Sequence, residues 1–125
     1  MGQVNSYRDL LVWEQAIDLA TAIYRCTKAW SKEELYGLTQ QARRAAVSIP
    51  ANIAEGNGRE LRGSYINFLR IAQGSLKELE THLIIAQRAG VAGEGEIEDL
   101  LARCESVGKL LRLLLRKLRE TQAAA

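Results

Sequence analysis

Residues 65–86, YINFLRIAQGSLKELETHLIIA, carry the most regular apolar pattern in this chain of 125 residues. Apolar or aromatic residues recur there at alternating spacings of four and three: Tyr65, Leu69, Ala72, Leu76, Leu79, Leu83 and Ala86. Because an α-helix has about 3.6 residues per turn, this spacing places all of them on one face of a helix. The pattern therefore predicts a long amphipathic helix over about residues 61–89.

Three further segments show helical periodicity. The segment at residues 7–29 has one apolar stripe at Leu10, Trp13, Ile17, Ala20, Tyr24 and Thr27. A second stripe runs beside it at Val12, Ala16, Leu19, Ile23 and Cys26. The core stripe of residues 32–57 consists of Leu35, Leu38, Ala42, Ala45, Ile49 and Ile53. In residues 96–120 the apolar face consists of Ile97, Leu100, Cys104, Val107, Leu111, Leu114 and Leu118.

Cap and turn signals separate these segments. Ser31 and Glu34 match the capping-box pattern at a helix start. Gly56 and Gly58 suit a helix end, and GVAGEG at residues 90–95 is typical of a loop. We therefore expect an all-α fold, an antiparallel up-down-up-down four-helix bundle. It forms a single domain over residues 1–125, with helices at about 7–29, 32–57, 61–89 and 96–120.

The composition, 47% hydrophobic and 26% charged, is that of a folded soluble protein. Cys26 and Cys104 stand alone on apolar helical positions, which predicts buried, reduced thiols. The N-terminus lacks the pattern of a signal peptide, and the apolar runs are too short to span a membrane. We therefore expect a cytoplasmic protein without a membrane partner.

A catalytic site would need a convergent set of reactive side chains. His82 is the single histidine and follows Glu78 by one helical turn, a pairing that is typical of a surface or structural histidine. Gly56 and Gly58 lack the spacing of a phosphate-binding glycine loop. We therefore expect a protein that is not an enzyme, with no catalytic residue, metal, cofactor or small-molecule substrate.

The stretch SIPANIAEG at residues 48–56 has features beyond a core stripe. A polar flank of its helix consists of Gln41, Arg44, Ser48, Asn52, Glu55 and Arg59. The rear carries small apolar residues: Val47, Pro50, Ala51 and Ala54. A helix in a monomeric bundle needs only one apolar face, so apolar residues on the opposite side predict self-association. The alternative is that the alanines there only raise helix propensity. The predicted oligomer interface is Val47, Pro50, Ala51, Asn52, Ala54, Glu55 and Gly74.

Three residues of this stretch carry separate expectations. Pro50 removes one intrahelical hydrogen bond and should kink the helix. Asn52 borders the core, so if buried it must be hydrogen-bonded. Glu55 can pair with an arginine of its own chain or of a neighbouring subunit, and the sequence leaves both pairings open.

Basic residues recur on the last segment at spacings of three, four and three, opposite the leucines. Such a stripe is either a solvated helix face or a surface that contacts phosphates. In an oligomer every copy repeats it, so phosphate contacts add. Most aromatic residues lie on core stripes, which disfavours recognition by base stacking. We therefore expect weak, electrostatic binding of RNA or DNA through Arg43, Arg44, Arg59, Arg62, Lys109, Arg112, Arg116, Lys117 and Arg119.

Several motifs closely resemble the 23S rRNA intervening-sequence protein family. They are ELYGLT at residues 34–39, QARRAA at 41–46, SIPANIAEG at 48–56, NFL at 67–69, GSL at 74–76 and ELET at 78–81. Leu11 and Trp13 also fit the N-terminal helix of that family. The resemblance spans about residues 7–90, and Ala29-Trp30 stand where the family often has Phe-Pro.

The resemblance implies a four-helix bundle that assembles into a homopentamer. Relatives are encoded within intervening sequences of large-subunit rRNA genes. A related branch comprises the accessory variability proteins of diversity-generating retroelements, whose basic barrel engages nucleic acid and a reverse transcriptase. We therefore expect an oligomeric nucleic-acid-binding bundle, accessory to a retroelement or to an rRNA intervening-sequence process. The alternative is a protein-only scaffold that binds a partner such as a reverse transcriptase.

Overall fold

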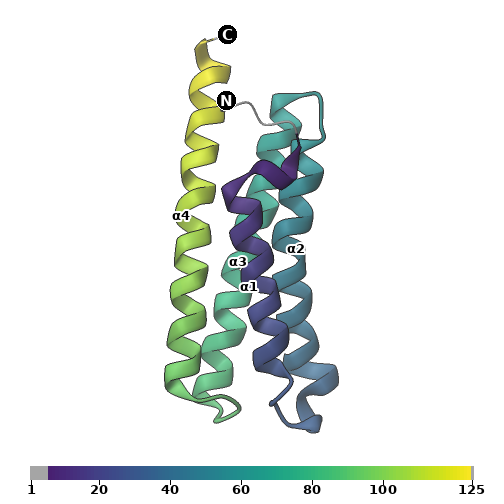
Figure 1. Ribbon diagram of the computed structural model, residues 1–125, viewed down its shortest axis with the longest axis vertical. Coiled ribbons are helices and arrows are strands. Elements are labelled where there is room, and N and C mark those ends of the chain that lie inside the picture. The colour runs from purple at the N-terminus through teal and green to yellow at the C-terminus, as the bar shows by residue number, and fades with distance from the viewer. Residues whose placement is uncertain (1–5, 125) are drawn as a thin grey trace.

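The computed structural model describes the backbone of residues 6–124 and the side chains up to Thr121. Its α-helices are α1 (Leu11–Thr27), α2 (Gln40–Asn57), α3 (Arg62–Arg88) and α4 (Glu94–Ala124). They run alternately up and down with short connections and form an antiparallel four-helix bundle (Figure 1). No strand occurs in residues 6–124. The predicted all-α fold is confirmed.

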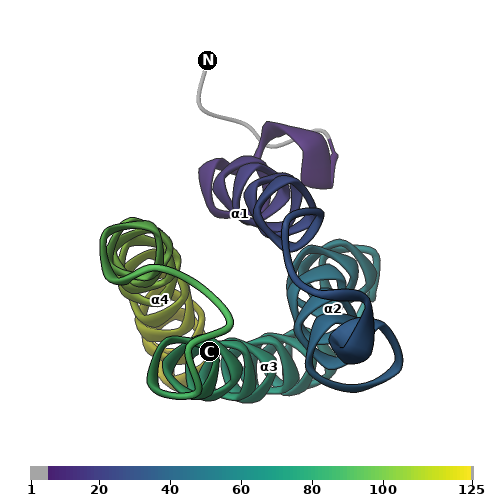
Figure 2. The ribbon, with the colours of Figure 1, turned by 90° about the horizontal axis from the view of Figure 1, so that it is seen from below.

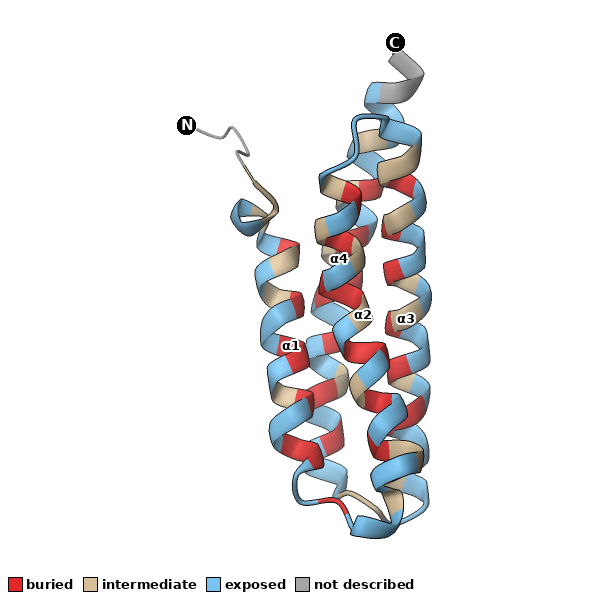
Figure 3. Ribbon diagram, turned by 90° about the vertical axis from the view of Figure 1, so that its right-hand side faces the viewer, coloured by how far each residue is buried: buried red, intermediate tan, exposed pale blue. Residues whose placement is uncertain are grey.

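The helices follow one another around the bundle in chain order, so α2 and α4 lie at opposite corners (Figure 2). The α2–α3 contact is the most extensive of the helix pairs, and the α1–α4 contact is the least extensive of the adjacent pairs. Buried residues lie on the sides of the helices that face one another (Figure 3). Because α4 is much longer than α1, the C-terminal part of α4 extends past the start of α1.

The core contains the predicted stripe of α3 from Leu69 to Ala86, whereas Tyr65 is half-buried. In α1 the second stripe forms the core, and of the first stripe Ala20 and Thr27 are also buried. Ile17 and Tyr24 of that first stripe remain 36% and 42% exposed. Near the end of α4 the buried leucine is Leu115, and the predicted Leu114 is only partly buried.

The start of α2 differs from the prediction. The helix begins at Gln40, because Gly37 adopts a non-helical conformation with φ −113° and ψ −109°. A short 3-10 turn, η2 (Lys32–Glu34), and a π-helical turn, η3 (Leu35–Thr39), precede it. The side chain of Ser31 makes no capping hydrogen bond, so the predicted capping box is wrong. Leu35, predicted in the core, is 43% exposed because the chain departs from the helix axis before Gly37.

The stretch SIPANIAEG lies inside α2, which continues through Pro50 to Asn57. Pro50 is buried within the subunit, and the 3-10 turn η1 (Tyr7–Asp9) packs against α2. Gly56 is also buried, because α2 and α3 approach closely there. A Cβ atom on Gly56 would lie 2.7 Å from the Cβ of Phe68. The two helices can therefore make this contact only with glycine at position 56.

Candidate nucleic-acid interface

The basic stripe predicted on the last helix lies on the surface of α4. Its five members are all exposed: Lys109, Arg112, Arg116, Lys117 and Arg119. Arg112 follows Gly108 by one turn, and a Cβ on Gly108 would lie 3.2 Å from Leu76 of α3. Arg112, Arg116 and Arg119 therefore occupy the flank of α4 that is turned toward α3. Lys109 lies at the outer edge of this stripe, where it lines a groove that also includes Gln15 of α1. Lys117 follows Leu110 by seven residues and lies on the flank toward α1, where Leu110 and Gln15 share a groove.

A groove of about 430 Å³ separates α3 from α4 beside this stripe. Its cations are Arg70 and Lys77 from α3 and Arg112 from α4, and no carboxylate lines it. The buried side chain of Leu76 and the backbone at Gly108 form its floor. We name the α3–α4 basic surface as Arg70, Lys77, Lys109, Arg112, Arg116 and Arg119.

The sequence interpretation did not include Arg70 and Lys77. They stand seven residues apart and therefore share one face of α3. This spacing is the feature of the sequence that could have indicated them. Lys77 forms an ion pair of 3.0 Å with Glu80, but the Lys77 side chain is 73% exposed. The exposed Lys77 side chain can therefore also reach an anion in solvent, although Glu80, which is only 21% exposed, already neutralises part of its charge.

Two of the predicted arginines hold helices of the subunit together. Arg43 donates from Nε to Thr27 Oγ1 at 2.9 Å, and its guanidinium lies 4.8 Å from the centre of the Tyr24 ring. Arg59 pairs with Glu55 at 3.0 Å and lies 4.8 Å from the centre of the Phe68 ring. The pairing left open for Glu55 is therefore formed within its own chain.

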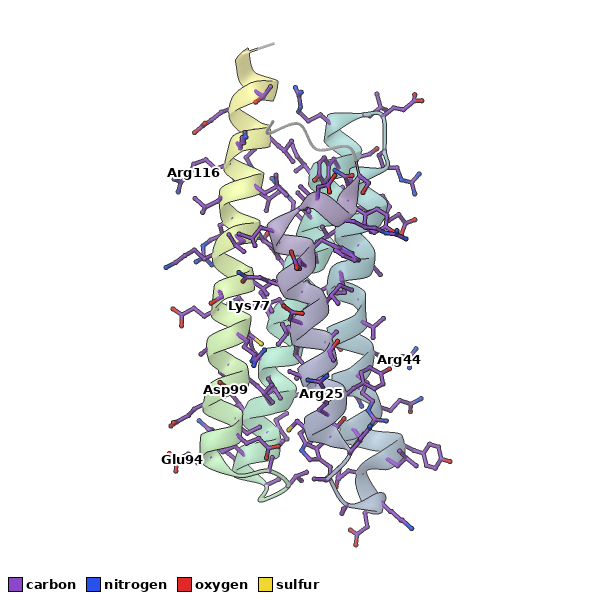
Figure 4. All side chains as sticks on the ribbon, viewed as in Figure 1. Arg25, Arg44, Lys77, Glu94, Asp99 and Arg116 are labelled. Carbon is purple, nitrogen blue, oxygen red and sulfur yellow. The ribbon has the colours of Figure 1, made fainter. Side chains whose placement is uncertain are left out.

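The remaining predicted arginines lie apart from each other. Arg44 is exposed on α2 and lies on the opposite side of the bundle from Arg116 (Figure 4). Arg62 is exposed at the start of α3, at the end of the bundle that the C-terminal half of α4 also reaches. The structure thus gathers the α4 stripe with Arg70 and Lys77, and it separates Arg44 from them.

The model of one protein family, described as 23S rRNA-intervening sequence protein, matches residues 8–113. The chain belongs to this family. The matched range includes the groove and Lys109, but it ends before Arg116, Lys117 and Arg119. A comparison with curated proteins gave no match.

A solved structure from Bacteroides thetaiotaomicron, a protein of unknown function from the S23 ribosomal protein family, has a similar fold. Its TM-score is 0.79 and its identity 24%, and the alignment covers 84% of this chain and 98% of that chain. This identity supports the shared fold alone.

The residues predicted at an oligomer interface of this family member differ in exposure. Val47 is 44% exposed, and Ala51, Glu55 and Gly74 are also exposed. Asn52 and Ala54 are half-buried, whereas Pro50 is buried within the subunit. A Cβ built on Gly74 would meet no atom within 4 Å apart from its chain neighbours and the backbone of its own helix. The exposed Val47 and Ala51 therefore leave the outer side of α2 accessible, whereas Gly74 lines the groove between α3 and α4.

Polar residues between α2 and α3 bond to one another. Asn52 donates from Nδ2 to the Ser48 carbonyl at 2.8 Å and to Ser48 Oγ at 2.9 Å. The hydroxyls of Ser48 and Ser75 lie 2.8 Å apart. The expectation that Asn52 is hydrogen-bonded is confirmed.

Three buried titratable groups, His82, Cys26 and Cys104, do not belong to the α3–α4 basic surface. His82 is buried, with Nε2 3.4 Å from a carboxylate oxygen of Glu78. Burial, followed by the nearby Glu96, raises the pKa of Cys26 to about 12. Burial, followed by the Glu80 charge, raises the pKa of Cys104 to about 12 as well. Both cysteines are buried free thiols, as predicted.

The described part of the chain contains no group of three or more His, Cys, Asp or Glu residues that is arranged to hold a metal ion. None of its helices is long and apolar enough to cross a membrane.

Proposed function

We propose that this chain is a non-enzymatic, cytoplasmic bundle that self-associates and binds RNA or DNA weakly through the α3–α4 basic surface. The observation that carries the proposal is the placement of Arg70, Lys77 and Arg112 around one groove that has no carboxylate in its lining. Lys109, Arg116 and Arg119 extend this positive surface along α4. In the proposed role the protein is accessory to a retroelement or to an rRNA intervening-sequence process.

The geometry of the surface suits a phosphate backbone better than base edges. Lys109 and Arg119 are ten residues apart, a distance of about 15 Å along a helix. Each cation that neutralises a phosphate releases a counterion, which gives affinity without sequence preference. No aromatic side chain lines the groove, so it offers no platform for base stacking. Binding is therefore expected to be salt-sensitive and indifferent to sequence.

Self-association strengthens such binding. The exposed Val47 and Ala51 supply a small apolar surface on the outer side of α2, where another copy can approach closely. An oligomer, a homopentamer by the resemblance described above, repeats the basic surface once per subunit. Several weak sites on one assembly bind a long nucleic acid more tightly than a single site does.

A second candidate function is a protein-only scaffold for a partner such as a reverse transcriptase. Ile71 and Ile85 favour it, because they remain 45% and 48% exposed on α3. They are separated by two heptads and thus share one side of the helix. Under this alternative the basic surface only contacts solvent, and reversing its charge leaves partner capture unchanged.

The deciding experiment is a salt titration of binding to a structured RNA, starting at ~50 mM salt, where phosphate contacts are strongest. The test variant carries Arg112→Glu and Arg116→Glu. The control carries Arg25→Glu and Arg44→Glu, which change the net charge equally but lie outside the α3–α4 basic surface.

We expect the test variant to bind more weakly, with a log–log salt slope shallower by about 1.8 if two phosphate contacts are lost. The control should keep the wild-type slope. Absence of binding by the wild-type protein at ~50 mM salt would contradict the proposal. Equal losses in both variants would contradict the location of the site. Light scattering tests self-association separately, and a monomer at tens of micromolar would exclude it.

A further inference from the structure

A smaller pocket, of about 240 Å³, lies where α1 leads into α2. This is the end of the bundle opposite the C-terminus of α4 (Figure 1). Its lining residues include three cations and no carboxylate: Thr27, Lys28, Trp30, Ser31, Lys32, Leu35, Thr39 and Arg43. The pocket is therefore electropositive and too small for a large organic molecule.

Thr39 gives the pocket an unused hydrogen-bonding group. Its side chain is 2% exposed, and Oγ1 has no hydrogen-bond partner within the described residues. Buried hydroxyls are nearly always paired, because an unpaired one has lost its water without compensation. The non-helical turn at Gly37 places Thr39 just before α2, at the wall of this pocket. A ligand oxygen in the pocket would supply the missing partner.

Arg43 supplies charge in a fixed orientation. Its Nε is committed to Thr27 Oγ1, and the plane of the guanidinium is held over Tyr24. These contacts leave its terminal nitrogens without an ion pair among the described carboxylates. A restrained guanidinium fork suits an oxyanion, and it loses little freedom on binding one. Lys28 and Lys32 add positive charge at the same wall.

We propose that this pocket binds a small oxyanion, the carboxylate or phosphate group of a ligand. The Thr39 hydroxyl and the Arg43 guanidinium donate to its oxygens, and Lys28 and Lys32 neutralise its charge. The site is separate from the α3–α4 basic surface and does not depend on nucleic-acid binding.

The two tryptophans of the chain make the proposal measurable. Trp30 lines the pocket, whereas Trp13 stacks edge-on against Tyr7 at 5.2 Å near the start of α1. Indole N–H signals of the full chain are followed by NMR during titration with inorganic phosphate, with acetate, and with sodium chloride at matched ionic strength. We expect a saturable shift of Trp30 alone, with a midpoint on the order of millimolar for so few ligand atoms. The anion with the lower midpoint identifies the preferred group.

Thr39→Val tests the role of the hydroxyl, because valine keeps the shape and removes the polar atom. We expect anion binding to weaken about tenfold, the usual effect of one lost hydrogen bond to a charged group. The same variant should unfold at a higher temperature without ligand, since it no longer buries an unpaired hydroxyl. Thr81→Val is the control, because its exposed hydroxyl donates to the Lys77 carbonyl at 2.8 Å, away from the pocket.

Three outcomes would overturn the proposal. They are a Trp30 shift that chloride reproduces, a shift that does not saturate with either anion, and unchanged anion binding by Thr39→Val. Loss of RNA binding after charge reversal on α4 has no bearing on these readouts.

Discussion

Gly56 and Gly74 form a natural pair for testing how α2 and α3 pack. Both lie within helices, but a Cβ on Gly56 would meet Phe68 Cβ at 2.7 Å and Tyr65 Cδ1 at 3.1 Å. The corresponding Cβ on Gly74 would meet nothing within 4 Å beyond its chain neighbours and its own helix backbone. Carbon atoms in contact prefer about 3.5–4.0 Å, so Gly56→Ala must push the two helices apart by roughly 1 Å. The positions of both Cβ atoms are fixed by the backbone, and no rotamer change relieves the clash.

Overpacking of this kind costs about 1–3 kcal/mol, whereas replacing glycine by alanine in a helix gains at most about 1 kcal/mol. We expect Gly56→Ala to lower the free energy of unfolding by about 1 kcal/mol and Gly74→Ala to raise it by about 1 kcal/mol. Urea unfolding, followed by circular dichroism, measures both changes in free energy, provided that the variants keep the same dependence on urea concentration. Equal stabilities of the two variants would refute the close approach of α2 and α3 at Gly56.

Further measurements test other contacts. Asn52→Ala should cost about 1 kcal/mol in urea unfolding, because Asn52 then no longer donates to Ser48; an unchanged midpoint would contradict that hydrogen bond. The Cys104 thiol has its pKa raised from 9.0 to about 12, so above pH 9 the unfolded state releases a proton that the folded state retains. The free energy of unfolding should therefore fall as pH rises from 9 toward 12. In Cys104→Ala this fall should be smaller by about 1.4 kcal/mol per pH unit. Parallel pH curves of the variant and the wild type would contradict the raised pKa of Cys104. Val47→Asp should leave the unfolding midpoint near wild type but reduce the mass measured by light scattering, since Val47 is 44% exposed in the subunit; an unchanged mass would exclude it from the interface.

The fold was predictable from the apolar spacing, because periodicity depends only on local helix geometry. The stripe from Leu69 to Ala86 entered the core as expected. The two stripes of α1 were harder to rank, since either could face inward. The neighbours of α1 decide between them, and they bury Ala16 and Ile23 while leaving Ile17 and Tyr24 at the edge.

The candidate surface was only partly predictable. Lys109, Arg112, Arg116 and Arg119 share a helix flank by spacing alone, and the structure places that flank on the surface. Arg70 and Lys77 were missed because they belong to another helix, and only the α3–α4 packing brings them beside Arg112. Arg43 and Arg59 look equally basic in sequence, yet they stack on Tyr24 and Phe68.

The sequence by itself determined the all-α class, the helix order and most of the core, because these follow from short-range periodicity and chain connectivity. It also indicated that SIPANIAEG is a helical segment with distinct faces. Tertiary structure alone decided what those faces meet: Ser48 meets Ser75, and Gly56 allows α2 to approach Phe68. The physical reason is that these contacts join atoms of different helices or fix one rotamer among several. The choice among them is set by helix packing, which residue spacing does not specify.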